Sequence, residues 1–182
     1  MQPFLVTHDI FRRAAFGRHH PLATGRQAAV QDLIEVLGWR GPASTRVPHL
    51  PGREVLERFH APEYLDALEQ ADAAGRATAE MRERYNLGTM ECPVFPGLWD
   101  RARATVGGSR LAGELVLSGG VAFHPTGGTH HGQPARASGF CYLTDPVFAV
   151  LRLLDGGLTR VLHVDLDAHH GDGVEAAFAR DP

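Results

Sequence analysis

Hydrophobic and polar positions along the chain follow two spacings, one typical of strands and one typical of helices. Short apolar runs predict strands at 4–8, 120–125 and 159–167. Longer stretches, in which apolar residues recur every three or four positions, predict helices at 24–38, 61–75, 98–119, 146–157 and 173–181. Residues 40–53 and 76–97 are rich in proline and glycine and predict loops.

Residues at the ends of several predicted helices support this assignment. Thr24 and Asp172 are suitable N-caps, and Pro62 and Pro146 suit a first helical turn. A Gly-Gly pair in the longest predicted helix indicates close packing there, at some cost in helix stability. Apolar strands that alternate with helices predict an α/β fold with a parallel sheet flanked by helices.

Two histidine-rich segments follow predicted strands. "THHG" (129–132) comes after the strand at 120–125, and "DLDAHHGD" (165–172) overlaps and follows the end of the strand at 159–167. In parallel α/β sheets, ligands bind beyond the carboxyl ends of the strands. Both segments are therefore expected at the edge of the sheet where such a fold forms its site.

Composition and charge narrow the class of protein. The chain has 182 residues, of which 43% are hydrophobic and 21% charged, and this predicts one globular domain over residues 1–182. A net charge of −3 gives no electrostatic reason to expect direct nucleic-acid binding. The apolar runs are shorter than the roughly 20 residues of a membrane span, and the N-terminus does not resemble a signal peptide. We therefore expect no membrane association and a cytoplasmic location.

Asp165, Asp167 and His169 form the strongest chemical signal in the sequence. Their spacing of two directs their side chains to one face of a strand. A carboxylate and an imidazole placed in this way suit Zn²⁺, Fe²⁺ or Mn²⁺. A single Asp or His more often caps a loop or a helix, but clustered carboxylates repel one another unless a cation offsets their charge. The cluster therefore favours a metal site.

The tandem His130 and His131 indicate acid–base chemistry. A histidine that acts as general base needs a partner on its other ring nitrogen, and Asp165 and Asp172 are candidates for that role. Two such dyads beside a metal ion are suited to hydrolyse an amide. The nearby "GFCY" suggests an aromatic wall with a close backbone approach at Gly139, although an ordinary buried strand or turn also explains it.

Together these motifs resemble a known family. "GTHHGQPARASGFCYLTD" followed by "VLHVDLDAHHGDGVEAAF" is similar to the zinc-dependent histone deacetylase superfamily, including its bacterial acetoin-utilisation-type members. Weaker similarity extends upstream through "HHPLATGR", "RFHAPEYLDAL" and "LGTMECPVFPGLWDRA". The resemblance implies the arginase/deacetylase-type fold, a three-layer sandwich with a parallel sheet between helices.

The resemblance also implies roles for the residues already singled out. Asp167 and His169 match two ligands of the divalent ion, which would be Zn²⁺ with Fe²⁺ as an alternative. His130 and His131 match the catalytic histidines, and Asp165 and Asp172 support them respectively. His131 is the expected general base, and His130 gives mainly electrostatic support.

Further positions match the substrate channel and a second cation site. Gly139 and Phe140 match residues that line the acyl-lysine channel. Arg26 matches an arginine at a cavity for released acetate. Glu91 lies where many members have an Asp that holds the substrate backbone, and its extra methylene departs from that pattern. A K⁺ ion is implied near Asp165, Asp167 and the carbonyl of His169.

The chain also departs from the family pattern at its C-terminal side. The third metal ligand, an Asp, and a Tyr that stabilises the transition state belong to later segments of the family's domain, so the sequence resembles the first half of a deacetylase domain that is incomplete. Such a half-sheet would expose apolar surface at its edge, which predicts self-association as a homo-oligomer.

Three functions are compatible with the sequence. The first is metal-dependent hydrolysis of acetyl-lysine or a small acetylated amine, and the second is a non-catalytic truncated homologue. The third is an arginase-type manganese hydrolase, because "DAHHGD" is similar to the D-A-H-x-D signature of that related fold. The tandem histidines and "ASGFCY" favour the deacetylase pattern over the arginase pattern.

Overall fold

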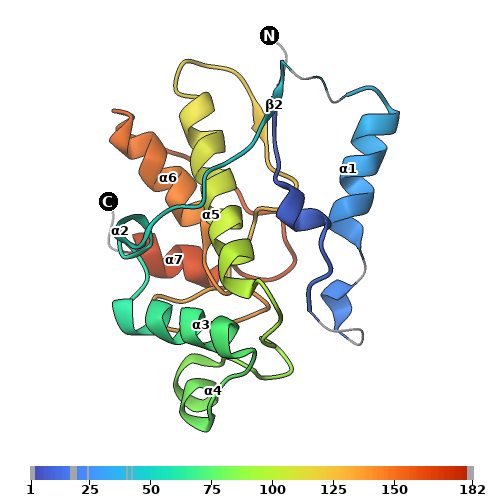
Figure 1. Cartoon of the computed structure of the whole chain (residues 1–182). Helices are drawn as coiled ribbons and strands as arrows, with labels where there is room; N and C mark the ends of the chain where they lie inside the picture. Colours follow the sequence, from blue (N-terminus) through green and yellow to red (C-terminus); the bar gives the residue numbers. More distant parts are fainter. Residues whose placement is uncertain (1–2, 17–19, 24, 40, 42, 180–182) are drawn as a thin grey trace.

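The computed structural model, which describes residues 3–16, 20–23, 25–39, 41 and 43–179, contains a small parallel sheet. Its strands are β1 (Phe4–Val6), β2 (Thr45–Arg46) and β3 (Ala122–Phe123), in the order β2-β1-β3. Leu5 lies opposite Thr45 on one side and Phe123 on the other. Helices flank this sheet, which confirms the α/β class and the parallel arrangement predicted from the sequence (Figure 1).

The helices account for most of the regular structure. The α-helices are α1 (Arg26–Val36), α2 (Arg53–Leu56), α3 (Pro62–Ala74), α4 (Ala79–Tyr85), α5 (Leu98–Leu115), α6 (Asp145–Asp155) and α7 (Asp172–Phe178). Two short 3₁₀ helices, η1 (Asp9–Arg12) and η2 (Pro21–Ala23), precede α1. Figure 1 shows α5 and α6 side by side on one side of β1, with α1 on the other side. None of the described helices is both long and apolar enough to cross a membrane.

Local signals explain where several helices begin and end. Helix α3 has Pro62 in its first turn, and it stops at Gly75, whose left-handed backbone (φ 66°) suits a residue without a side chain. Asp172 is the first residue of α7 and Gly171 is the N-cap, so the sequence-based prediction of Asp172 as the cap is wrong by one position. Thr24, the predicted cap of the first helix, lies outside the described residues.

Helix α4 corrects the prediction of a loop over 76–97. Thr78 caps this helix, because its hydroxyl accepts a hydrogen bond from the backbone N–H of Met81 (3.1 Å). Asn86 ends it in a left-handed conformation (φ 58°). The seven-residue helix is too short for its apolar spacing to stand out in the sequence. Strand β2 lies within the predicted loop 40–53 and, with two residues, is also too short to be predicted.

The glycine pair in α5 allows close packing, as the sequence indicated. A side chain at Gly107 would collide with the carbonyl oxygen of His49, and one at Gly108 would collide with the ring of His124. The N-terminal and middle parts of α5 also contribute to the main hydrophobic core, which gathers side chains from α3, α4, α6 and the loops between them. Its most buried members are Leu56, Tyr64, Leu65, Leu68, Leu87, Leu98, Val106 and Phe148.

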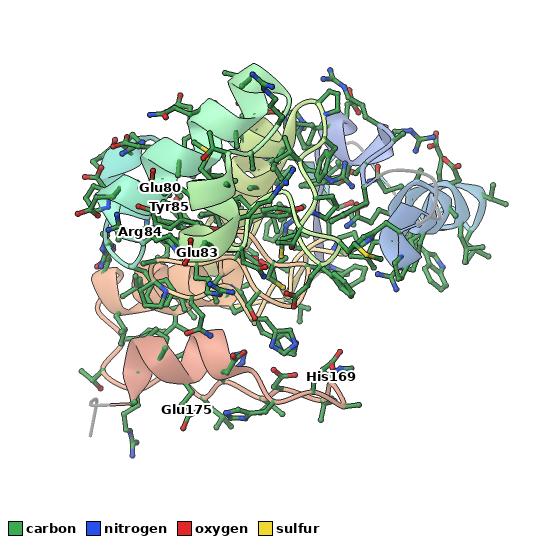
Figure 2. All side chains as sticks on the ribbon, turned by 90° about the horizontal axis from the view of Figure 1, so that it is seen from below. Glu80, Glu83, Arg84, Tyr85, His169 and Glu175 are labelled. Carbon is green, nitrogen blue, oxygen red and sulfur yellow. The ribbon has the colours of Figure 1, made fainter. Side chains whose placement is uncertain are left out.

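The segment 159–167 corrects the third strand prediction. It forms no strand, and none of its residues takes part in a backbone ladder within the described chain. Leu162, Val164 and Leu166 are 87%, 63% and 92% exposed. An apolar run becomes a buried strand only when a neighbouring strand supplies hydrogen-bond partners, and none of the three described strands pairs with it. In Figure 2, His169 and Glu175 mark the layer that this segment and α7 form beside the rest of the molecule.

Candidate active site

Both histidine-rich segments border the same cavity, which has a volume of about 540 Å³. His130 and His131 come from the loop between β3 and α6, whereas Asp167 and His169 come from the segment before α7. Aromatic side chains complete the walls: Phe16, Phe95, Phe140 and Tyr142. The structure thus brings together residues that are almost forty positions apart in the sequence.

His130 and Asp165 form the more buried of two dyads. Nδ1–H of His130 donates to Oδ2 of Asp165 over 2.6 Å, and the His130 side chain is only 10% exposed. Hydrogen bonds from His130 and from the backbone N–H of Asp167 lower the pKa of Asp165 below its ordinary value. A carboxylate that remains ionised holds the imidazole in one tautomer, so Nε2 of His130 carries the lone pair.

His131 and Asp172 form the second dyad. Nδ1–H of His131 donates to Oδ1 of Asp172 over 2.7 Å, and the side-chain amide of Gln133 donates to Oδ2 of the same carboxylate over 2.9 Å. The His131 side chain is 20% exposed, and its Nε2 has no hydrogen-bond partner among the described residues. The two imidazole rings lie with their centroids 4.1 Å apart. His131 is thus oriented by a carboxylate and still accessible from the cavity.

Helix α7 docks directly on the backbone of the tandem histidines. The backbone N–H of Gly173 donates to the carbonyl of His130 over 2.9 Å. A side chain at Gly173 would collide with the carbonyl oxygen of Gly132. Because Asp172 is the first residue of α7, this docking also sets the position of the second dyad. Gly173, which allows this docking, carried no functional signal in the sequence.

Asp167 and His169 supply the donor types that a divalent ion such as Zn²⁺ requires. Oδ1 of Asp167 lies 3.0 Å from Nδ1 of His169 and accepts the backbone N–H of His169 over 2.8 Å. The backbone hydrogen bond, first, and the His169 side chain lower the pKa of Asp167. Catalytic Zn²⁺ takes three protein ligands, and the described residues contain no group of three or more His, Cys, Asp or Glu side chains that could hold a metal ion. Asp167 and His169 are therefore suitable ligand types for such an ion, but they supply two ligands instead of three.

Gly139 and Phe140 form a tight turn in the cavity wall. Ser138 and Cys141 exchange backbone hydrogen bonds of 3.1 and 2.8 Å, and both residues between them have positive φ (52° and 67°). This is the two-residue hairpin turn that usually favours Asn-Gly. A side chain at Gly139 would collide with the ring of His131. The close approach suggested by "GFCY" is therefore real, and its partner is His131.

Arg26 and Glu91 have different relations to the cavity. Arg26 is the first residue of α1 and lines the cavity together with Gln27 and Arg101. Glu91 does not line the cavity, and its carboxylate accepts a hydrogen bond from the backbone N–H of Gly139. The K⁺ site at Asp165, Asp167 and the His169 carbonyl stays a prediction.

Two buried polar residues that the sequence did not single out anchor the loop carrying the histidines. Asp145 is 1% exposed and accepts the backbone N–H groups of Gly128 (3.1 Å) and Thr129 (2.6 Å), as well as the hydroxyls of Ser109 and Thr129. His60 is equally buried and bonds to the far end of the same loop. Asp145 is the last residue of the motif "GTHHGQPARASGFCYLTD". Its position in that motif was the only feature of the sequence that could have indicated its role.

Comparison with known proteins gives a consistent result. A family profile described as the histone deacetylase domain matches residues 20–182. The acetoin utilization protein AcuC of Bacillus subtilis (strain 168) is 38% identical over 170 residues, which cover 92% of this chain and 43% of that protein. Histone deacetylase 1 of Homo sapiens is 35% identical over 168 residues, covering 90% of this chain and 34% of that protein.

Solved structures agree with the sequence comparison. The crystal structure of an HDAC homolog from Aquifex aeolicus matches with a TM-score of 0.91 and 31% identity, covering 98% of this chain and 48% of that one. An HDAC homolog complexed with SAHA matches with a TM-score of 0.90 and 32% identity. The chain spans about half the length, or less, of the relatives it matches.

Proposed function

We propose that this chain, which belongs to the histone deacetylase family, contributes the proton-transfer residues of a metal-dependent hydrolase that removes acetate from acetyl-lysine or a small acetylated amine. The single observation that carries the proposal is the pair of His–Asp dyads on one cavity. Each imidazole is oriented by a carboxylate on Nδ1, which leaves Nε2 for proton transfer. The family relationship supports amide hydrolysis as the reaction that these dyads serve.

His131 is the general base in this proposal. It is the more exposed imidazole, and Asp172, itself held by Gln133, stabilises the charge that His131 gains when it takes a proton from the attacking water. The protonated imidazole then returns a proton to the amine that leaves. His130, paired with the more buried Asp165, supports the reacting atoms electrostatically.

Asp167 and His169 would hold the divalent ion, Zn²⁺ or Fe²⁺. When bound, such an ion polarises the acetyl carbonyl and makes water more acidic. Phe140, with Gly139, would form a wall of the channel that receives the acyl-lysine chain, since both residues line the cavity. Arg26 also lines it and is the candidate contact for released acetate.

Acetate release from an acetyl-lysine peptide tests the proposal. With Zn²⁺ present we expect turnover that a chelator abolishes. Substituting His131→Ala should lower kcat by about 10²–10⁴-fold and leave bound metal unchanged. His49→Ala is the matched control, because His49 is exposed and absent from the cavity lining. An unchanged rate in the His131 variant would refute the assignment of the base.

A metal-binding, non-catalytic role is the second candidate. The observation in its favour is that the described residues supply two donors where a catalytic zinc site takes three. A metal-loaded chain without turnover would support this role over the first. No contact among the described residues favours the arginase-type alternative.

Metal content tests the ligands separately from activity. Substituting Asp167→Ala should release the divalent ion, since a single remaining imidazole binds it weakly. Mass spectrometry of the protein under native conditions measures the metal per chain, with Asp100→Ala on the exposed surface of α5 as control. Equal metal content in the two variants would show that Asp167 is not a ligand.

A further inference from the structure

Glu91 makes two strong hydrogen bonds on the outer side of the cavity wall. Its Oε1 accepts the backbone N–H of Gly139 over 2.7 Å, and its Oε2 accepts the side-chain amide of Asn86 over 2.7 Å. The hydrogen bond from Asn86, first, and that from Gly139 lower the pKa of Glu91. Charge-assisted hydrogen bonds of this kind are about twice as strong as neutral ones. Both carboxylate oxygens are thus already engaged within the protein.

The turn that Glu91 holds is intrinsically unfavourable. Phe140 has a φ of 67°, a region that side-chain-bearing residues rarely occupy unless surrounding contacts impose it. The neighbouring Gly139 lies against the ring of His131, so a shift of this turn changes the space around the imidazole. A contact that fixes the turn therefore also fixes the surroundings of His131.

Asn86 connects this contact to the rest of the fold. It ends α4, is 7% exposed, and donates both to Glu91 and to the carbonyl of Ala137 (3.1 Å). Ala137 donates its own N–H to the carbonyl of Tyr85 over 3.0 Å. The helix end, the carboxylate and the turn are thus joined by hydrogen bonds up to Gly139, which packs against the ring of His131.

We propose that Glu91 is a positioning residue: it fixes the wall formed by Gly139 and Phe140 against His131, rather than holding the substrate backbone. This role rests on the proposed function, since the wall borders the cavity assigned there to the acyl-lysine chain. Two observations set it apart from a substrate contact. Glu91 does not line the cavity, and each of its oxygens already has a partner.

The two roles predict different substrate dependence. A residue that holds the substrate backbone matters only for a peptide substrate, because a small acetylated amine has no backbone beyond its acetamide. A residue that fixes the wall matters equally for both, because both substrates pass along Gly139 and Phe140. The ratio of the losses for the two substrates therefore separates the roles.

Steady-state kinetics with an acetyl-lysine peptide and an acetylated alkylamine measure this ratio. Glu91→Ala should lower kcat/KM about ten- to a hundredfold for both substrates, with most of the loss in kcat. Glu91→Gln retains one oxygen for the Gly139 N–H and should restore part of the rate. Glu83→Gln on the exposed side of α4 is the control. A loss confined to KM for the peptide would overturn the proposal.

A second measurement decides the proposal without turnover. Hydrogen exchange of the Gly139 amide, followed by NMR, should accelerate about tenfold or more in Glu91→Ala and remain unchanged in Glu83→Gln. An unchanged Gly139 amide in a folded Glu91→Ala protein would overturn the positioning role. If neither substrate is hydrolysed by the wild-type chain, the proposed function fails while this exchange measurement still decides the role of Glu91.

Discussion

At the scale of single residues, the site depends on how closely backbone can approach an imidazole. Gly139 and Gly173 lie where a Cβ would meet His131 and the backbone beside it, and Gly139 also needs a positive φ. Because neither glycine has a side chain, the turn and α7 can both pack closely against the loop that carries the two histidines. The dyad geometry therefore depends on residues that have no functional group of their own.

Substituting Gly139→Ala tests this dependence. The new methyl group would meet the His131 ring and would occupy a left-handed backbone position, so the free energy of unfolding should fall by about 1–3 kcal/mol. Urea unfolding measures the change. Gly38→Ala is the control, because Gly38 also has a positive φ (70°) but nothing lies within 4 Å of its Cβ position. Equal losses in the two variants would show that contact with His131 contributes nothing.

At the scale of elements, the loop between β3 and α6 is anchored at both ends by buried polar side chains. Asp145 binds its beginning at Gly128 and Thr129, and His60 binds its later part. Nδ1–H of His60 donates to the carbonyl of Gln133, and its Nε2 accepts the backbone N–H of Thr144, both over 3.1 Å. This second role requires a neutral imidazole. Burial lowers the pKa of His60 to about 4, which keeps it neutral.

This shifted pKa predicts a pH dependence of stability. The unfolded chain takes up a proton near pH 6.5, whereas folded His60 does so only near pH 4. The unfolded state binds more protons between these values, so the free energy of unfolding falls as the pH drops, by about 2 kcal/mol between pH 7 and pH 5. His60→Gln should lose this component, while His49→Gln, an exposed control, should retain it. Urea unfolding at the two pH values provides the test, and identical slopes in both variants would contradict it.

At the scale of the whole molecule, the segment 159–167 forms no backbone pairing with the described strands of the sheet. Leu162, Val164 and Leu166 expose apolar side chains within this segment. Extended apolar segments without paired backbone favour association with other chains. We propose this segment as the contact surface for the self-association that the sequence predicts.

Replacing Leu162 and Leu166 with Ser should weaken this association. Sedimentation velocity over a range of protein concentrations should show a lower fraction of oligomer than in the wild-type chain, because the apolar surface that favours contact is removed. Met90→Ser is the control, since Met90 is 95% exposed but lies in a different loop. An unchanged oligomer fraction would place the contact elsewhere on the molecule.

Much of the architecture could be predicted from the chain alone. The five predicted helices appear close to their expected positions, because apolar spacing, Pro62 and Gly75 act through neighbouring residues. The pairing of His130 with Asp165 and of His131 with Asp172 was also expected, from a motif in which residue types and order are distinctive. Helix α4 was missed because its seven residues give too little periodicity.

What the sequence determined by itself is the set of local conformations and the identity of the groups that carry chemistry, because these depend on neighbouring residues and on side-chain type. Only the tertiary structure decided which distant groups meet: Glu91 with the turn at Gly139, His60 with the loop, and the unpaired state of 159–167. Backbone pairing and steric contact depend on positions far apart in the chain, and no local pattern encodes them.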